Sequence, residues 1–267
     1  MLLDAGSDVN KASNERETAL HYAARHGHRS CVGLLLDCSD VDLNARTMWG
    51  LTPLMLAANS RSSELALQLV GAGAAVTARD RADKTVLHYA AKNALTTLGQ
   101  WLLELGADPD AADSDGNSPL VEALVAGGGG GGGEPSPTVG LLVRFGCRVR
   151  DVVGHATVSG DYRWCTPLEL AVHRGHARAA RLLHAAGCDF AQFLVPVEPA
   201  TLAARLSPSA VEWMSRCVGQ PRSLVDTVRI VIREALDVRQ QDKLSALPLP
   251  PALVTYLSFN DEREFDD

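Results

Sequence analysis

The chain has 267 residues, 46 % of them hydrophobic, and its 25 basic and 32 acidic side chains give a net charge of −7. This apolar content excludes a largely disordered chain, and the acidic balance argues against nucleic-acid binding, which needs a basic face. Aromatic residues make up only 5 %, which is low for a conventional large core. No apolar run reaches the roughly 18 residues of a membrane helix, and the N-terminus lacks a signal-peptide pattern. We therefore expect neither a nucleic-acid nor a membrane partner.

A short motif recurs along the first two thirds of the chain. The segment TALHYAA at residues 18–24 returns, with substitutions, at residues 52–58, 85–91, 118–120 and 166–171. Successive copies begin 34, 33, 33 and 48 residues apart. A period near 33 with the pattern T-P-L-H-x-A is the sequence signature of the ankyrin repeat. The stretch from residue 1 to residue 190 therefore resembles an ankyrin array.

Each copy carries the signals of two helices and a loop. The Thr or Ser that opens the motif suits a helix N-cap, and the Pro that often follows suits a first helical turn. Gly27 and Gly175 are placed to end the first helix, and a second helix follows, as at residues 31–36. Polar segments such as residues 113–117 predict hairpin loops between the units. We expect an all-α fold, an ankyrin-repeat solenoid whose units are stabilised by stacking on their neighbours.

The 48-residue interval contains two insertions. Seven surplus residues coincide with the glycine run 127–133, which we place between the first and second helix of its unit. The run lacks the Gly-Lys-Ser/Thr of a phosphate loop and predicts a flexible connection. Eight further residues lengthen one hairpin within residues 147–165. Residues 2–10 have the pattern of the end of a repeat, so we expect missing upstream sequence; the alternative is an array that begins with half a unit.

After residue 190 the repeat fades. Residues 191–221 are either a linker or a degenerate last repeat, and residues 260–267 form an acidic tail. Between them, a helix cap precedes an apolar stripe of Leu224, Val228 and Ile232 at helical spacing. A proline-rich segment then leads into a final helix, and its characteristic residues are Leu247, Pro248, Leu249, Pro250, Leu253 and Tyr256.

Residues 222–259 resemble a SOCS box, a small three-helix module, and the order of array and box resembles that of the ankyrin repeat and SOCS box family. The resemblance implies that elongin B and elongin C bind through Leu224, Val228 and Ile232, with Val228 where the family has Cys. It also implies that the proline-rich segment and the helix after it select cullin-5 with its RING protein. Without the proline-rich segment, the stripe would be interpreted as a helix face packed on the last repeat.

Nothing in the sequence points to catalysis, a metal or a cofactor. No Ser/His/Asp, Cys/His or paired-carboxylate arrangement stands out as catalytic. The six cysteines contain no C-x-x-C pair, so we expect the reduced thiols of an intracellular protein. His21 and His88 fall in the His position of the motif, where the imidazole supports the turn, and the histidines beside Gly27 and Gly175 occupy matching repeat positions.

Two hairpins carry residues that are typical of protein interfaces. Met48 and Trp49 lie at a hairpin tip, where polar residues are usual, and Tyr162, Arg163 and Trp164 lie in the lengthened hairpin. Aromatic residues and Arg are enriched at interface cores and hot spots. We expect these side chains to contribute to binding a protein substrate; for Trp164 the alternative is inward packing against the next unit.

The motifs and the resemblance together lead to one functional hypothesis and one alternative. The first is a non-catalytic substrate receptor of an elongin–cullin–RING ubiquitin ligase, located in the cytoplasm with the nucleus as a second compartment. In it the array captures a target protein and the box recruits the ligase. The alternative is an ankyrin-repeat interaction scaffold that recruits no ligase.

Overall fold

The computed structural model describes residues 8–127, 136–149, 153–158 and 161–188. The chain divides into two compact units, residues 1–114 and residues 115–267. Over the described ranges the two units together contain ten helices and two strands. None of these helices is long and apolar enough to cross a membrane.

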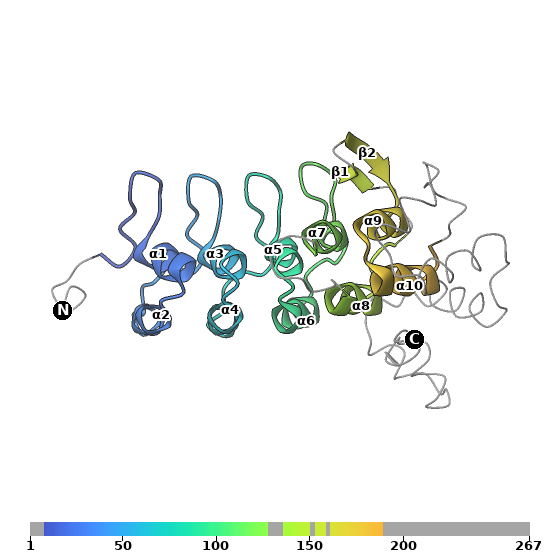
Figure 1. The fold of residues 1–267 in the computed structure, drawn as a ribbon. Helices are drawn as coiled ribbons and strands as arrows, with labels where there is room; N and C mark the ends of the chain where they lie inside the picture. Colours follow the sequence, from blue (N-terminus) through green and yellow to red (C-terminus); the bar gives the residue numbers. More distant parts are fainter. Residues whose placement is uncertain (1–7, 128–135, 150–152, 159–160, 189–267) are drawn as a thin grey trace, which may run out of the picture. The chain divides into compact units, whose positions relative to one another are not determined.

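The first unit stacks three helix pairs, and each pair follows a hairpin loop that we call a finger. Figure 1 shows the first helices of the pairs in one row and the second helices in a row beneath, with the fingers projecting on the side of the first row. Fingers 1, 2 and 3 span residues 9–17, 42–51 and 75–84, and residues 108–114 begin a fourth finger. The helices are α1 (Ala19–His26), α2 (Arg29–Leu36), α3 (Pro53–Asn59), α4 (Ser63–Gly71), α5 (Val86–Lys92) and α6 (Thr96–Glu104).

The helix boundaries fall where the capping residues predict them. Thr18, Thr52 and Thr85 have extended backbones and precede α1, α3 and α5, and the Thr52 hydroxyl oxygen accepts a hydrogen bond from the Met55 backbone N–H at 3.3 Å. A cap of this kind satisfies one of the backbone donors that a helix leaves open at its start. Gly27 ends α1 with a φ of 71°, a left-handed conformation that glycine adopts without strain.

The core of both units is built mainly of leucine, alanine and valine. Ala24, Ala57 and Ala58 are fully buried, and they allow the helices to approach closely. The largest fully buried side chains of the described residues are eleven leucines and one methionine, with no aromatic residue among them. Burying one such leucine contributes about 1.5–3 kcal/mol. The low aromatic content of the sequence therefore reflects small helix pairs that bury their leucines against neighbouring pairs.

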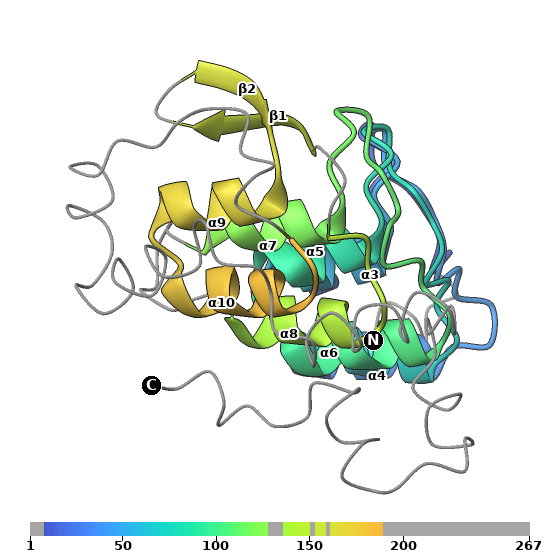
Figure 2. The ribbon, with the colours of Figure 1, turned by 90° about the vertical axis from the view of Figure 1, so that its right-hand side faces the viewer.

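In its described residues, the second unit contains two further helix pairs and a pair of strands. Helix α7 packs against α9, and α8 packs against α10. Figures 1 and 2 both show the two strands on one side of α9 and α10 on the other side. The elements are α7 (Pro119–Ala126), α8 (Ser136–Arg144), β1 (Val153–Val158), β2 (Asp161–Cys165), α9 (Pro167–Arg174) and α10 (Ala177–Ala185).

Both predicted insertions fall within the sequence range of the second unit. Helix α7 ends at Ala126 and α8 begins at Ser136, so the glycine run falls between the two helices of one pair. The eight extra residues fall in the finger before α9. Residues 128–133 of the glycine run lie outside the described residues.

The all-α prediction is confirmed for the helical repeats and needs one correction, because the lengthened finger forms strands. β1 and β2 pair antiparallel, with Val158 opposite Asp161 and Thr157 opposite Tyr162, and the register shifts between Val153 and Ala156. An insertion of this length can satisfy its backbone N–H and C=O groups by pairing with itself. The two segments also contain Val, Thr, Tyr and Trp, which favour strands.

Several predicted segments lie outside the described residues. They are the start of the array (residues 1–7), the linker or degenerate repeat (191–221), the SOCS box (222–259) and the acidic tail (260–267). The predicted boundaries of these segments therefore remain predictions from the sequence.

Candidate protein interface

The tip of each finger in the first unit is held by one side chain at a fixed position, five residues before the helix cap. The Thr47 hydroxyl oxygen accepts hydrogen bonds from the backbone N–H of Trp49 at 3.2 Å and of Leu51 at 3.1 Å. Asp80 does the same in finger 3, where its Oδ1 accepts from the N–H of Ala82 and Lys84 at 2.8 and 2.9 Å. Such side-chain-to-backbone bonds replace the ladder of a longer hairpin and fix the tip.

Neighbouring fingers are joined to one another through their backbones. The N–H of Met48 donates to the carbonyl of Glu15 at 2.8 Å, and the N–H of Arg81 donates to the carbonyl of Trp49 at 3.0 Å. The N–H of Ser114 donates to the carbonyl of Ala82 at 2.9 Å, one repeat further along. The tips therefore form a continuous row in the first unit, and each tip is positioned by the one before it.

Two arginines strengthen this row from the same repeat position. The Arg46 guanidinium donates to the carbonyl of Arg79, and the Arg79 guanidinium donates to the carbonyl of Ala112 at 2.7 Å. Sequence reasoning missed this pair, although Arg46 and Arg79 stand 33 residues apart, which is the repeat period. Their common spacing was the available signal.

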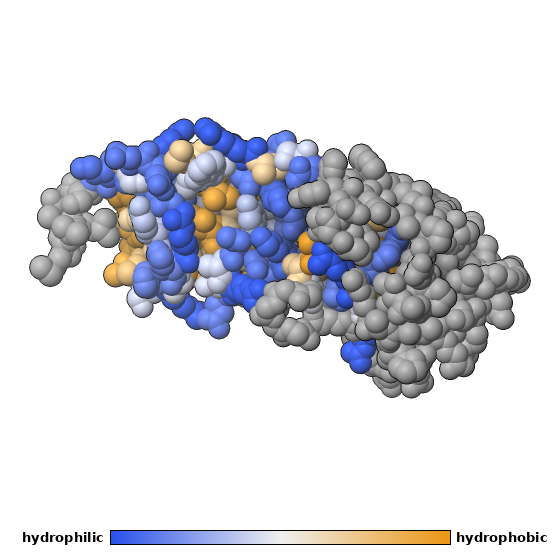
Figure 3. Space-filling view, turned by 45° about the horizontal axis from the view of Figure 1, so that its top comes forward, coloured by the Kyte–Doolittle hydropathy of each residue, from blue (hydrophilic) through white to orange (hydrophobic). Residues whose placement is uncertain are grey.

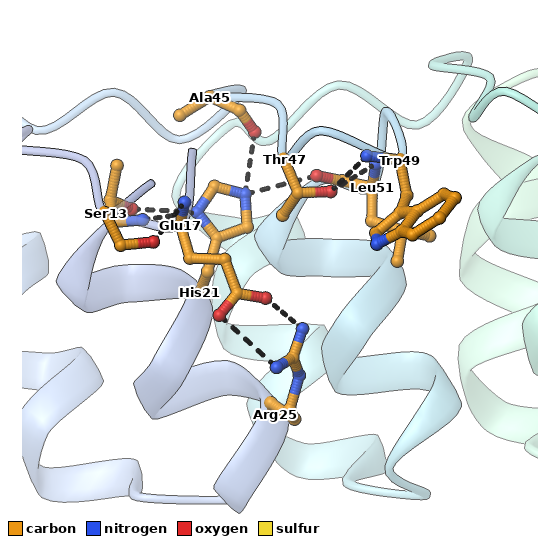
Figure 4. Close-up of polar contacts among 9 residues, drawn as sticks. Ser13, Glu17, His21, Arg25, Ala45, Thr47, Trp49 and Leu51 are labelled. Carbon is orange, nitrogen blue, oxygen red and sulfur yellow. Dashed lines mark hydrogen bonds and ion pairs between the residues drawn. The ribbon is translucent and has the colours of Figure 1, made fainter. Parts of the chain in front are cut away.

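A histidine joins the first helix pair to the next finger, as the close-up in Figure 4 shows. His21 Nδ1 accepts from the backbone N–H of Thr18 at 3.1 Å, so its other nitrogen, Nε2, carries the proton. Nε2 lies 3.0 Å from the carbonyl oxygen of Ala45 and 3.1 Å from that of Leu51, and it donates to them. Burial lowers the pKa of His21 below its ordinary value of 6.5. The predicted structural role of this histidine is confirmed.

The histidine that follows Gly175 also has a structural contact. His176 is buried, and its Nε2 lies 3.1 Å from the carbonyl oxygen of Leu124, at the end of α7. Over the described ranges, no group of three His, Cys, Asp or Glu side chains lies close enough to hold a metal ion.

The predicted substrate-binding residues lie in different units. In the first unit, Met48 is half-buried and Trp49 is 58 % exposed at the tip of finger 2; Figure 4 shows its indole extending away from the His21 cluster. Tyr162, Arg163 and Trp164 belong to β2 in the second unit, where the structure describes the course of the backbone. The predicted elongin- and cullin-binding residues, from Leu224 to Tyr256, lie outside the described residues.

The helix pairs and fingers define an ankyrin-repeat protein. Family models agree: one for ankyrin repeats (3 copies) matches residues 1–80, and one for ankyrin repeats (many copies) matches residues 71–123. A third model, for the SOCS box, matches residues 220–258. The chain is also 31 % identical over 274 residues to the human (Homo sapiens) protein named Ankyrin repeat and SOCS box protein 16. The chain therefore carries ankyrin repeats followed by a SOCS box, the two modules in the name of this relative.

The alignments differ in how much of each protein they cover. The alignment with the human relative covers 96 % of this chain and 55 % of the relative, so the chain spans about half of that protein's length. B-cell lymphoma 3 protein homolog of Mus musculus is 33 % identical over 48 % of this chain and 32 % of its own length. Human neurogenic locus notch homolog protein 2 is 36 % identical over 42 % of this chain and 5 % of its own length. The last two matches cover less than half of the chain.

Proposed function

We propose that this chain is the non-catalytic substrate-recognition subunit of an elongin B/C–cullin–RING ubiquitin ligase. The observation that carries the proposal is the order of modules, with ankyrin repeats matched over residues 1–123 and a SOCS box over residues 220–258. In this proposal the SOCS box binds elongin B and elongin C through Leu224, Val228 and Ile232. The array binds the protein to be modified.

The proposed mechanism is proximity. A receptor that holds a substrate lysine near a charged conjugating enzyme raises the effective concentration of that lysine. It needs no catalytic side chain of its own. It needs a binding surface that stays in place, and the backbone bonds that join the fingers of the first unit would hold such a surface.

Co-purification with elongin B and elongin C tests the proposal. The full chain should retain both proteins, and Leu224→Asp should lose them because a charge replaces an apolar contact. The matched control is Leu34→Asp, the same change at a side chain that is 63 % exposed on α2 in the array. It should retain both elongins. Absence of elongin from the unmutated chain would contradict the proposal.

The SOCS box should divide its work between two partners. We propose that Leu247, Pro248, Leu249 and Pro250, with Leu253 and Tyr256, bind cullin-5 with its RING protein. Replacing both Pro248 and Pro250 with Ala should weaken cullin binding and leave elongin binding intact. Equal loss of both partners would refute this division.

We also propose that Met48, Trp49, Tyr162, Arg163 and Trp164 contact the substrate. The support is the exposure of Trp49 on a finger that is bonded on both sides. Trp49→Ala and Trp164→Ala should each weaken the binding of an identified substrate. Unchanged binding in both variants would exclude these hairpins from the substrate interface.

One observation favours a second function, an interaction scaffold that recruits no ligase. Val228 stands where the resemblance to the SOCS box calls for Cys, and a Val228→Cys variant separates the two functions. If the unmutated chain lacks elongin and the variant gains it, the scaffold function is supported.

We further propose a cytoplasmic location with the nucleus as a second compartment, which imaging of the labelled chain in cells checks.

A further inference from the structure

The fingertips of the first unit present an unusual combination of side chains. We call the exposed residues Arg16, Arg46, Trp49, Arg79 and Arg81 the fingertip surface. The backbone bonds between neighbouring tips place them in one row, because residues 15, 48, 49 and 81 are linked directly. Figure 3, with the finger side turned forward, shows mostly hydrophilic residues over this part of the first unit. An exposed indole in such a setting needs an explanation.

The backbone that carries the Trp49 indole is held by a tight turn. The Gly50 N–H donates to the Thr47 carbonyl at 2.9 Å, and Gly50 has a φ of 77°, which closes a tight turn. A Cβ atom on Gly50 would lie 2.9 Å from the Arg46 guanidinium and 3.1 Å from the Arg81 backbone nitrogen. Both arginines therefore lie beside the turn that carries the indole. A fixed backbone lowers the entropy cost of placing the indole against a partner, and exposed Trp is a typical interface hot-spot residue.

The positive charge of the fingertip surface is not neutralised by neighbouring carboxylates. Arg46 and Arg79 donate to backbone carbonyls, which carry no net charge. The three ion pairs identified among the described residues involve Arg25, Arg29 and Lys84 instead. The exposed charged residues of fingers 1–3 are three acids, Glu15, Asp42 and Asp83, against Lys11 and the four arginines. A surface with a net charge of about +2 thus exists on a protein whose total charge is −7.

The next finger has the opposite charge. Residues 108–114 contain no basic residue; Asp108 is exposed and Asp110 is half-buried, whereas Asp113 is buried and pairs with Lys84 of finger 3 at 3.5 Å. Asp80, in finger 3, is buried and accepts a 2.5 Å hydrogen bond from the Tyr89 hydroxyl, so it adds little to the exposed surface. Charge along the row of tips therefore changes sign between finger 3 and finger 4. Such a change fixes the orientation of a charged partner and excludes a basic one from the arginines.

We propose that the fingertip surface binds an acidic linear segment of the captured protein, one that carries Asp or Glu side chains around a single apolar residue. Carboxylates pair with the guanidinium groups of Arg16, Arg46, Arg79 and Arg81, and the apolar residue packs on the Trp49 indole. The inference rests on the proposed function, because it states what kind of substrate the array captures.

Selection from a library of random 16-residue peptides, displayed on phage, tests the proposal on the full chain. Enriched peptides should be acidic and should contain an aromatic or aliphatic residue. The most enriched peptide is then synthesised with a fluorescent label and titrated by fluorescence polarisation. Enrichment of neutral or basic peptides, or no enrichment, would overturn the proposal.

Matched variants assign the binding to the fingertips. Trp49→Ala should weaken the labelled peptide about tenfold or more, and Arg81→Glu should weaken it by a similar factor. Trp101→Ala, at an indole that is 50 % exposed on α6, and Lys92→Glu, at an exposed lysine on α5, should have no effect. Equal loss in both pairs of variants would overturn the proposal, as would binding that does not weaken when salt is raised.

The outcome is independent of the ligase proposal. Each variant is also assayed for elongin co-purification, which depends on residues 222–259 and not on the fingers. Loss of peptide binding in Trp49→Ala with elongin retained supports the fingertip site. Failure of peptide selection with elongin retained refutes the fingertip site alone, whereas peptide selection without elongin refutes the ligase alone.

Discussion

The helices α1 and α9 use the same position in different ways. Their third residues are His21 and Glu169, and each completes a capping box with the preceding Thr. A neutral imidazole accepts on one side and donates on the other, so His21 caps its own helix and also reaches the carbonyls of finger 2. A carboxylate accepts only, so Glu169 can serve the cap but cannot donate to a finger.

The fingers show the same contrast between bonds to a neighbouring repeat and bonds within one repeat. Fingers 1, 2 and 3 are bonded to one another across repeats that are 33 or 34 residues long. The finger before α9 contains eight extra residues and pairs with itself as β1 and β2. Constant repeat length therefore allows bonds between fingers, whereas a longer finger satisfies its backbone internally.

The cores of the two units should respond alike to a cavity, and this has the largest expected effect. Leu54 and Leu168 occupy the same repeat position, and each is fully buried. Leu54→Ala and Leu168→Ala should each lower the free energy of unfolding of their unit by about 2–5 kcal/mol. Hydrogen exchange of α3 and α9 measures the two losses separately. A large effect in one unit and none in the other would show that the difference extends beyond the fingers.

The His21 side chain should contribute more to the stability of its helix than Glu169, its counterpart in the second unit. His21→Ala removes bonds to Thr18, Ala45 and Leu51 and should cost about 1–3 kcal/mol in hydrogen-exchange protection of α1. Glu169→Ala, measured in α9, should cost about 1 kcal/mol, as expected for a cap. The control is His26→Ala at the exposed end of α1, which should have no measurable effect. A larger loss for Glu169→Ala would reverse the comparison.

A smaller effect is expected in the pH dependence of the stability of the first unit, which contains His21. Because burial lowers the pKa of folded His21, the unfolded chain gains a proton near pH 6.5 that the folded chain does not. The contribution of His21 is therefore complete above pH 6.5 and is lost as the pH falls below it. Between pH 7 and pH 6 this loss should be about 0.7 kcal/mol at most. His21→Gln should remove that part of the pH slope in the first unit, and an unchanged slope would contradict the assignment.

The two units can also be compared through the reactivity of one cysteine in each, without any substitution. Cys31 is exposed on α2, whereas burial raises the pKa of Cys165 to about 11, with the nearby Glu169 as a second cause. The thiolate is the reactive form, so Cys165 should react with a thiol reagent at pH 8 roughly 100-fold or more slowly than Cys31. Mass spectrometry of the labelled native chain measures both rates. Equal rates would contradict the burial of Cys165.

Sequence periodicity predicts the helices and the positions of both insertions because those depend on local signals. Thr18, Thr52 and Thr85 are recognisable caps, and counting from them places the glycine run between α7 and α8. The strands in the second unit were not predicted, because self-pairing depends on the whole insertion and not on a repeat position. The place of Trp49 at a hairpin tip was predicted from the repeat, whereas the backbone bonds that join this tip to residues 15 and 81 were not.

The glycine run shows how freely the length of this chain can change at one point. The helices of the pair α7 and α8 are separated by residues 127–135, whereas α1 and α2 are separated by residues 27–28 alone, and each pair still packs together. The added cost of closing the longer connection is roughly 1 kcal/mol, since loop-closure entropy grows only with the logarithm of length. This junction is therefore a place where evolution can add residues at little cost. An epitope or a fluorescent reporter spliced in at residue 130 would use the same tolerance.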